Sequence, residues 1–226
     1  MPKISIIIPV FNEEKTVGTV LRGLLALSFE KEIIVVDDGS SDKTLEKIEE
    51  IKVDKIKVFH HQSNLGKGAA LRSGIKMTTG EYIVFCDADL EYKTNQISNL
   101  FECAVKNRCQ VVYGSRFIKY QPKKNFIHYL GNRFLTWATN LLFGSNLTDM
   151  ETGYKLFRAD ILRGLDLISA RFEIEPEITA KILKKGIKII ELPISYDPRV
   201  KSEGKKIKYR DGLAALWLLV KERVSS

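Results

Sequence analysis

The sequence predicts an α/β fold with a mostly parallel central sheet flanked by helices. Its first half alternates short β-branched runs with longer stretches of helical periodicity, which is the pattern of parallel sheets. Hydrophobic residues make up 44% of the 226 residues and charged residues 28%, as in an ordinary globular chain. No repeat, low-complexity tract or linker interrupts the chain, so we expect a single domain over residues 1–226.

The strands of the first half are predicted by apolar, β-branched runs that end at turn-forming residues. Residues 4–10 form a near-continuous apolar run, as expected for a buried strand of a parallel sheet. The other predicted strands of this half lie at 33–36, 57–60, 82–86 and 110–113.

Helical periodicity fills the segments between these strands. Apolar residues recur on one helical face of 13–27, and Ser41 or Asp42 can cap the helix after the second strand. The further helices of this half are predicted through 45–48 and at 66–77 and 95–106.

The second half is less regular. Residues 126–143 have a helical pattern and are apolar on most sides, which is typical of a helix that is buried or lies at a membrane interface. A strand–helix–strand passage follows, with its helix at 175–184 and its last strand at 187–194. An amphipathic helix is predicted at 212–224.

The formal net charge is +8, and much of the excess is clustered. One basic cluster lies within 199–210, and a second comprises Lys119, Lys123, Lys124 and Arg133. Such clusters favour nucleic acid, a phosphorylated substrate or an anionic membrane surface as partner. No nucleic-acid-reading motif accompanies them, so we expect no nucleic-acid partner and keep a non-enzymatic nucleic-acid-binding protein as a remote alternative.

The cellular location is predicted from cysteine usage and from the apolar runs. Cys86, Cys103 and Cys109 lack metal-ligand spacing and indicate a reducing compartment. The first strand follows residues 1–3 directly, which leaves no room for a signal peptide, and no uninterrupted apolar run approaches the ~20 residues that span a bilayer. We therefore expect a cytoplasmic protein, peripheral at the inner face of the cell membrane.

Three polar clusters follow predicted strands, at 11–14, 37–40 and 87–91. The carboxyl ends of parallel strands meet at one edge of the sheet, which is where such folds bind ligands. Turn and capping chemistry explains each cluster alone. Three converging groups of carboxylates, however, repel one another unless a cation or a ligand rich in hydrogen-bond donors lies between them.

The cluster at 87–91 places the carboxylates of Asp87, Asp89 and Glu91 at alternate positions, so they can point to one side of the chain. Hard oxygen ligands of this kind suit Mg²⁺ or Mn²⁺, which would share its coordination with a diphosphate. We therefore predict a divalent-metal cofactor there.

Other nucleotide sites lack their phosphate-binding loops. The chain has no G-x-G-x-x-G after its first strand and no G-x-x-x-x-G-K-[ST], and the glycine-rich 64–68 is too short for either. A sugar nucleotidyltransferase, another metal-dependent α/β enzyme, is disfavoured because its glycine-rich N-terminal phosphate loop is missing.

Five motifs in order give the sequence a family resemblance. They are Ile-Ile-Pro-Val-Phe-Asn-Glu-Glu, Val-Asp-Asp-Gly-Ser-Ser-Asp, Asn-Leu-Gly-Lys-Gly, Gly-Glu-Tyr-Ile-Val-Phe-Cys-Asp-Ala-Asp-Leu and Gly-Ser-Arg. In this order they resemble family 2 inverting glycosyltransferases of the GT-A fold. More narrowly, they resemble the dolichyl- or polyprenyl-phosphate hexosyltransferases typified by dolichyl-phosphate mannose synthase. The resemblance covers roughly residues 3–210, and its donor-binding half is about 1–116.

The resemblance implies a role for each residue that matches the family pattern. A binding site for the nucleotide-sugar donor is implied at Pro9, Phe11, Glu13, Val36, Asp38, Asp87, Ala88, Asp89, Arg116, Arg199, Ser202 and Lys205. The implied metal ligands are Asp89 foremost, with Asp87 and Glu91, and the implied catalytic residues are Asp89, Asp149 and Arg116. Phe11 stands where the family often has Tyr. The loop at 199–206 reads Arg-Val-Lys-Ser-Glu-Gly-Lys-Lys where many relatives have Gly-Glu-Ser-Lys, which leaves its contacts open.

The implied reaction is metal-dependent transfer of a hexose, with inversion, from a GDP-mannose or UDP-glucose type of donor to polyprenyl or dolichyl phosphate. A phosphate monoester, whose second pKa is about 6, needs no base at neutral pH. A saccharide hydroxyl, as in cell-surface polysaccharide synthesis, is the alternative acceptor and needs a carboxylate such as Asp149, Glu175 or Glu177. The last two also fit an exposed first helical turn, where the helix dipole favours acids.

The apolar helices bear on the choice of acceptor. The segment 126–143 and the run 213–220, both with basic flanks, suit an anionic membrane that carries polyprenyl phosphate. We therefore expect the half at about 117–226 to face the acceptor and the membrane. The same helices can instead pack on the sheet, on a second copy in a homodimer, or on a membrane-protein partner.

Overall fold

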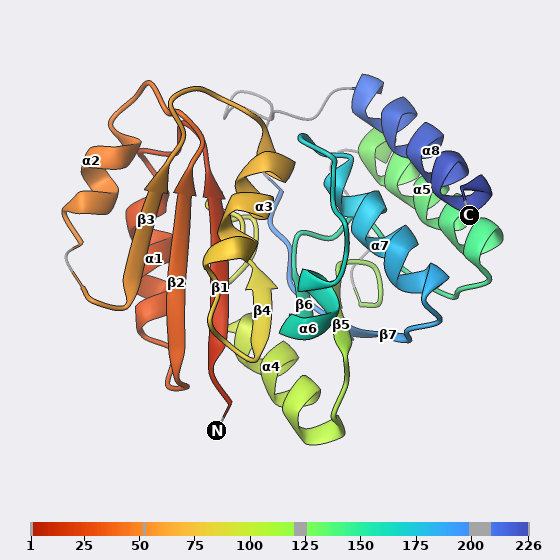
Figure 1. Ribbon diagram of the computed structural model, residues 1–226, viewed down its shortest axis with the longest axis horizontal. Helices are drawn as coiled ribbons and strands as arrows, with labels where there is room; N and C mark the ends of the chain where they lie inside the picture. The colour runs from red at the N-terminus through yellow and green to blue at the C-terminus, as the bar shows by residue number, and fades with distance from the viewer. Residues whose placement is uncertain (1, 52, 120–125, 199–208, 226) are drawn as a thin grey trace.

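The computed structural model describes residues 2–51, 53–119, 126–198 and 209–225 of the chain. Their centre is a seven-stranded sheet in the order β3-β2-β1-β4-β6-β5-β7 (Figure 1). Its strands are β1 (Ile4–Val10), β2 (Lys31–Asp37), β3 (Ile56–His60), β4 (Tyr82–Phe85), β5 (Val111–Ser115), β6 (Lys155–Arg158) and β7 (Ile189–Pro193). Of the strands within the described residues, β6 alone runs antiparallel to its neighbours, β4 and β5, so the predicted mostly parallel sheet is confirmed.

The helices fall close to the predicted segments. They are α1 (Val17–Leu25), α2 (Thr44–Glu49), α3 (Lys67–Met77), α4 (Gln96–Asn107), α5 (Phe126–Phe143), α6 (Ala159–Arg163), α7 (Ile174–Lys184) and α8 (Tyr209–Val224). The first helix is shorter than the predicted 13–27. The backbone N–H of Glu13 donates to the Thr44 hydroxyl at 2.7 Å, which ties this stretch to the start of α2 before α1 begins.

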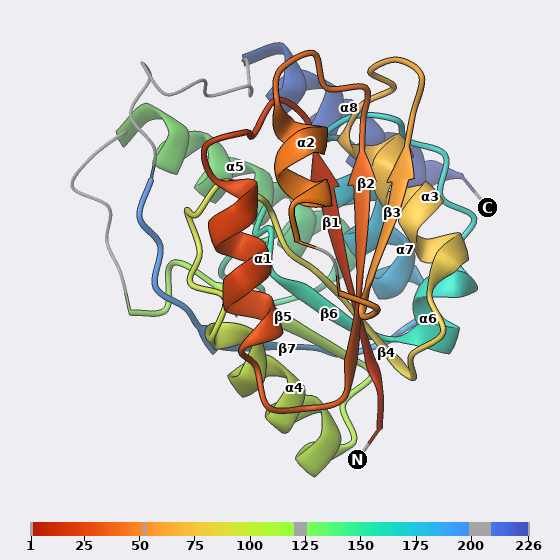
Figure 2. The same ribbon diagram turned by 90° about the vertical axis from the view of Figure 1, so that its left-hand side faces the viewer.

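Helices cover both faces of the sheet (Figure 2). Alternate side chains of β1 point to opposite faces, as the period of a strand requires. Ile6 and Ile8 belong to the core that includes α1, α2 and α4, whereas Ile7 belongs to the core that includes α3, α6 and α7. The central strand is therefore buried on both faces, which explains its near-continuous apolar sequence.

Helices α5 and α8 lie outside this three-layer arrangement, beside α7 (Figure 1). Leu135 of α5 and Leu219 of α8 form a third core with Ala180 of α7. Each outer helix therefore buries one side, as an amphipathic helix does. No helix within the described residues is both long enough and apolar enough to cross a membrane.

Candidate active site

The ends of three adjacent parallel strands bring the three polar clusters to one edge of the sheet. Strand β1 lies between β2 and β4, and all three run in the same direction. The loops after β1 and β2 are tied together, because the backbone N–H of Ser41 donates to Asn12 Oδ1 at 2.8 Å. The predicted convergence of the clusters is therefore confirmed, and it defines the candidate site.

Asp38 organises one side of this edge. Its carboxylate accepts hydrogen bonds from the backbone N–H groups of Leu65 (3.0 Å) and Gly66 (2.8 Å) and lies 2.7 Å from His61 Nδ1. The side chain is almost completely buried. Asp38 thus fixes the loop that leads into α3, and its predicted contact with a nucleotide stays a prediction.

The other predicted donor residues on or next to β1 and β2 differ in burial: some lie at the carboxyl edge of the sheet, and Val36 lies in the core. Pro9 and Val36 lie opposite each other in the β1–β2 register. Val36 is fully buried in a core with Ala70 of α3, so its side chain packs inside the protein. Phe11 and Glu13 are half-buried at the carboxyl end of β1.

Asp87 belongs to a chain of buried and partly buried charges that sequence analysis missed. Lys67 Nζ lies 2.8 Å from Asp87 Oδ1 and 3.0 Å from Glu175 Oε1, and Lys155 Nζ lies 2.5 Å from Glu175 Oε2. Burial alone would lower the pKa of Lys67, but the two carboxylates raise it above its ordinary value. The sequence feature that could have indicated these ion pairs is Lys67, which lies in the glycine-rich segment 64–68.

The turn that follows β4 is strained at Leu90. This residue has a φ of 62°, a left-handed conformation that costs a leucine free energy. On either side of it, Asp89 Oδ1 accepts the backbone N–H of Glu91 at 3.0 Å. Ala88 is buried, whereas Asp87, Asp89 and Glu91 are partly exposed. Such strain recurs at functional turns.

The predicted metal ligands fit this geometry only in part. Across the part of the chain that the structure describes, no three Asp, Glu, His or Cys side chains are grouped so that they could hold an ion. Asp87, Asp89 and Glu91 therefore do not form the expected three-carboxylate site. A Mg²⁺ ion commonly needs only one or two carboxylates when substrate phosphates complete its coordination. Asp89 and Asp87, both partly exposed at the sheet edge, fit that smaller requirement.

Arg116 and Asp149, both predicted catalytic residues, form a buried ion pair. Arg116 Nε and one terminal NH₂ group donate to the two Asp149 oxygens, both at 2.7 Å, and the Arg116 backbone N–H adds a bond at 2.9 Å. Burial alone would lower the pKa of Arg116, but Asp149 raises it above its usual range. Asp149 is fully buried, so as found here it holds Arg116 in place. Their catalytic roles stay predictions.

The expectation that Glu175 and Glu177 lie in an exposed helical turn is wrong. Both are buried at the start of α7. Burial alone would raise the pKa of Glu175, but Lys155 and Lys67 lower it. Glu177 accepts the backbone N–H groups of Ile168 and Ser169 at 2.9 and 2.8 Å. The turn is buried because the loop before α7 folds over it, which helical periodicity alone does not reveal.

Glu151 is a second residue that sequence analysis missed. Among the described residues none hydrogen-bonds to its Oε1 atom, which is buried. Burial raises the pKa of Glu151 to about 7, even though Lys155 and Arg116 act to lower it. Those two cations already pair with Glu175 and Asp149. No sequence motif marked Glu151, because its property arises from folding.

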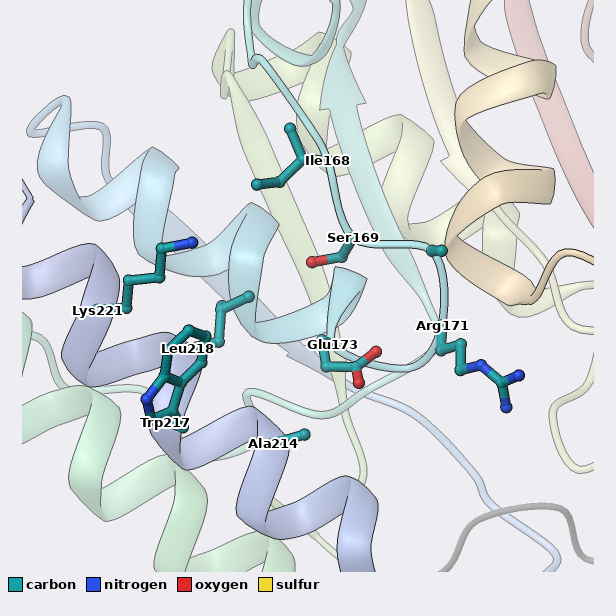
Figure 3. Close-up of a pocket in the computed structure, with 9 residues that line it drawn as sticks. Ile168, Ser169, Arg171, Glu173, Ala214, Trp217, Leu218 and Lys221 are labelled. Carbon is teal, nitrogen blue, oxygen red and sulfur yellow. The ribbon is translucent and has the colours of Figure 1, made fainter.

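A pocket of about 430 Å³ lies between the loop before α7 and helix α8. Arg171 and Trp217 lie at its opposite ends, with Glu173 between them (Figure 3). The same loop packs against the start of α3, where the backbone N–H of Ala69 donates to the Ala170 carbonyl at 2.9 Å. The pocket therefore adjoins the segment that carries Lys67. The predicted donor residues Arg199, Ser202 and Lys205, like Lys123 and Lys124, lie outside the described residues.

Comparison with known proteins identifies the class of enzyme. The sequence model of glycosyl transferase family 2 matches residues 5–165. The chain therefore belongs to glycosyl transferase family 2 and is a glycosyltransferase. Glucosyl-3-phosphoglycerate synthase from Mycobacterium tuberculosis shares its GT-A fold, with a TM-score of 0.75 over 98% of this chain and 79% of that chain, at 19% identity. One structure of that enzyme contains Mn²⁺, uridine diphosphate and phosphoglyceric acid, with a TM-score of 0.75 and 18% identity over 100% of this chain and 80% of that chain.

Two similar sequences come from archaea. The chain is 31% identical to a dolichol-phosphate mannosyltransferase of Pyrococcus furiosus over 215 residues, which are 90% of this chain and 59% of the relative. It is 27% identical to glycosyltransferase AglJ of Haloferax volcanii over 87% of this chain and 63% of that relative. The chain thus spans about three fifths of these two relatives.

Proposed function

We propose that this chain transfers a hexose from a nucleoside-diphosphate sugar to polyprenyl phosphate, with inversion at the anomeric carbon. The observation that carries the proposal is the strained Asp87–Glu91 turn at the carboxyl edge of the sheet, with the cation Lys67 beside Asp87. Carboxylates for a metal and a cation for phosphate are the groups that a nucleotide-sugar donor requires.

The donor-site roles follow from this arrangement. Asp89, with Asp87, would hold Mg²⁺ or Mn²⁺, and the bound ion would neutralise charge on the leaving diphosphate. Lys67 is within 3.0 Å of two carboxylates, so an approaching phosphate can take over part of its pairing. Arg116, whose charge Asp149 balances, would approach the sugar or the phosphates of the donor, as the resemblance implies. The remaining predicted donor residues are proposed on the resemblance alone.

The reaction requires one bond exchange at the sugar. An acceptor phosphate oxygen forms a bond to the anomeric carbon on the face opposite the leaving group. The bond from that carbon to the donor diphosphate breaks, and its electron pair leaves with the nucleoside diphosphate. Because a phosphate monoester is largely a dianion above a pH of about 6, no base is required for this acceptor.

Two observations support a lipid-phosphate acceptor. One is the similarity to the Pyrococcus enzyme, whose name specifies dolichol phosphate. The other is the pocket beside α3, whose lining combines two cations, Arg171 and Lys221, and one carboxylate, Glu173, with apolar side chains such as Trp217 and Leu218. A phosphate joined to an apolar chain needs both kinds of surface. We propose that the enzyme is cytoplasmic and peripheral at the inner face of the cell membrane.

Calorimetric titration with GDP, UDP and their sugars, with and without Mn²⁺, tests the donor site. We expect metal-dependent binding of one nucleotide family, followed by transfer of its sugar to a short polyprenyl phosphate. Asp89→Ala should abolish metal-dependent turnover. Asp54→Ala, an exposed carboxylate that precedes β3, is the matched control and should change turnover less than about twofold. Full activity of Asp89→Ala would reject the site.

A second acceptor is favoured by Glu151 alone. A saccharide hydroxyl needs a base, and a carboxyl with a pKa near the operating pH is suited to accept its proton. Glu151 has a pKa of about 7, and Asp149, Glu175 and Glu177 all hold hydrogen-bonded partners. In this version, Glu151 takes the hydroxyl proton while the anomeric carbon–oxygen bond to the acceptor forms.

The variant Glu151→Gln separates the two acceptors. With polyprenyl phosphate as acceptor, Glu151→Gln should retain turnover within about tenfold. With a saccharide acceptor, it should lose at least about a hundredfold, because general-base catalysis contributes that much. In the latter case, wild-type turnover should rise with pH through about 7, as Glu151 loses its proton. Donor binding should be unaffected in both cases.

A further inference from the structure

The outer helices carry an exposed apolar surface of regular spacing. On α5, Leu130, Phe134, Trp137 and Leu141 are half or more exposed, and on α8 so are Leu213, Trp217 and Val224, with Val220 at 46%. In both helices these residues recur at i, i+4, i+7 and i+11, which places each set along one helical face. Together we call them the α5/α8 apolar face.

Both tryptophans of the chain belong to this face. Trp137 is 58% exposed and Trp217 is 65% exposed, although tryptophan is usually among the most buried residues on average. Large exposed apolar surfaces on soluble proteins mark interaction sites. Tryptophan in particular is enriched where a protein meets the boundary between water and lipid.

The positive charge of the two helices and of the whole chain favours an anionic partner for this face. Helix α5 contains no Asp or Glu, and its only full charge is Arg133. Among the described residues, Lys119 precedes α5 in the sequence, and the last turn of α8 carries Lys221 and Arg223 against Asp211 and Glu222 in the same helix. A second copy of the chain carries the same whole-chain net charge of +8 and would be repelled, whereas an anionic bilayer would attract it.

We propose that the α5/α8 apolar face inserts into the interfacial layer of an anionic membrane and docks the enzyme there. This inference deepens the proposed function, since a lipid-linked acceptor is presented at such a surface. Trp217 contributes to both the face and the pocket beside α3. The docked face would therefore lie next to the pocket proposed for the acceptor.

The two tryptophans make the test direct. Vesicles of phosphatidylcholine, with and without phosphatidylglycerol, are added to the wild-type protein and to Trp137→Phe and Trp217→Phe, each of which keeps one tryptophan. We expect the emission of both tryptophans to shift to the blue with the anionic vesicles. A shift from only one tryptophan, or from neither, overturns the two-helix face.

Co-sedimentation with the vesicles measures the affinity of the protein for the membrane. The double variant Trp137→Gln/Trp217→Gln should bind anionic vesicles at least about tenfold more weakly, because interfacial binding scales with the apolar area inserted. The matched control is Val58→Gln/Phe59→Gln, two residues that are 41% exposed on edge strand β3. It should change binding less than about twofold, and an equal loss in both double variants overturns the proposal.

Two further results, dimerisation through this face and failure of the proposed acceptor, can be distinguished from membrane docking. A dimer in lipid-free solution that the tryptophan double variant abolishes would make the face an interface between copies and overturn the proposal. Donor binding, measured without vesicles, should be the same in all variants. If the protein docks as proposed but does not glycosylate polyprenyl phosphate, the acceptor assignment fails and the docking face stands.

Discussion

Leu90 gives the clearest residue-scale test of the candidate site. At most positions glycine is less stable than alanine by about 0.5–1 kcal/mol. At Leu90 the φ of 62° reverses this order, because alanine keeps the left-handed strain and glycine does not. We predict that Leu90→Gly unfolds with a free energy about 1 kcal/mol greater than Leu90→Ala, measured by urea denaturation. Equal stability, or greater stability of the alanine variant, would show that the turn stores no strain.

The Glu151 carboxyl predicts a pH dependence of stability. Its folded-state pKa of about 7 exceeds the ordinary value of 4.5, so its contribution is fully present below about pH 4.5 and is lost as pH rises to about 7. The loss is at most about 3 kcal/mol, since a pKa that differs by one between the folded and unfolded states changes the free energy of unfolding by about 1.4 kcal/mol. Glu151→Gln cannot ionise there and should avoid the loss.

We therefore predict that Glu151→Gln and wild type differ little in unfolding free energy near pH 4.5. By about pH 8 the variant should be more stable by roughly 2–3 kcal/mol. Urea denaturation at the two pH values measures this difference. The pKa of Glu32 is lowered to about 2, so its contribution to stability grows as pH rises. This contribution is the same in wild type and variant and therefore cancels in the comparison. A difference that is the same at both pH values would mean that Glu151 titrates normally.

At the scale of elements, the local sequence pattern predicted where helices and strands lie better than it predicted which strands pair. Periodicity located α5 at its observed bounds and β1 likewise, because each is governed by its own apolar pattern. The position of β6 between β4 and β5 has no local signal. The same holds in the site: the acidic motif is visible in sequence, but the Lys67–Glu175 contact joins residues from distant parts of the chain.

The junction between α3 and the loop before α7 is an element-scale contact that depends on glycine. A Cβ at Gly68 would lie 2.5 Å from the Ser169 carbonyl oxygen and 2.9 Å from the Ala170 carbonyl carbon, both backbone atoms. We predict that Gly68→Ala lowers the free energy of unfolding by about 1–3 kcal/mol, because overpacking forces the loop to move. It should also weaken donor binding, since Lys67 is the adjacent residue.

The control for this junction is a helical glycine with space around it. No atom lies within 4 Å of a Cβ at Gly212 in α8, so Gly212→Ala should raise the free energy of unfolding by about 0.5–1 kcal/mol. Chemical denaturation of both variants measures the pair. If Gly68→Ala is also stabilising, the loop before α7 is not held against α3 as described.

The whole molecule is joined across its sequence halves by the sheet. Strand β6 comes from the acceptor half, yet it pairs with β4 and β5 of the donor half. Strand β5 pairs with β6 and β7, so both of its neighbours lie beyond residue 116. The division into a donor half and an acceptor half is therefore one of proposed roles, and the two halves share one sheet.

This sharing predicts that the chain unfolds as a single cooperative unit. We expect one calorimetric transition whose measured enthalpy equals the van't Hoff enthalpy, at about 160 kcal/mol for a chain of this length. The fragment 1–116 should not fold, because its β5 would have no strand neighbour and its β4 would have lost one. Circular dichroism and hydrogen exchange of the fragment provide the test. A folded fragment that binds nucleotide would show instead that the donor half is an independent domain, and that the second half is added to it.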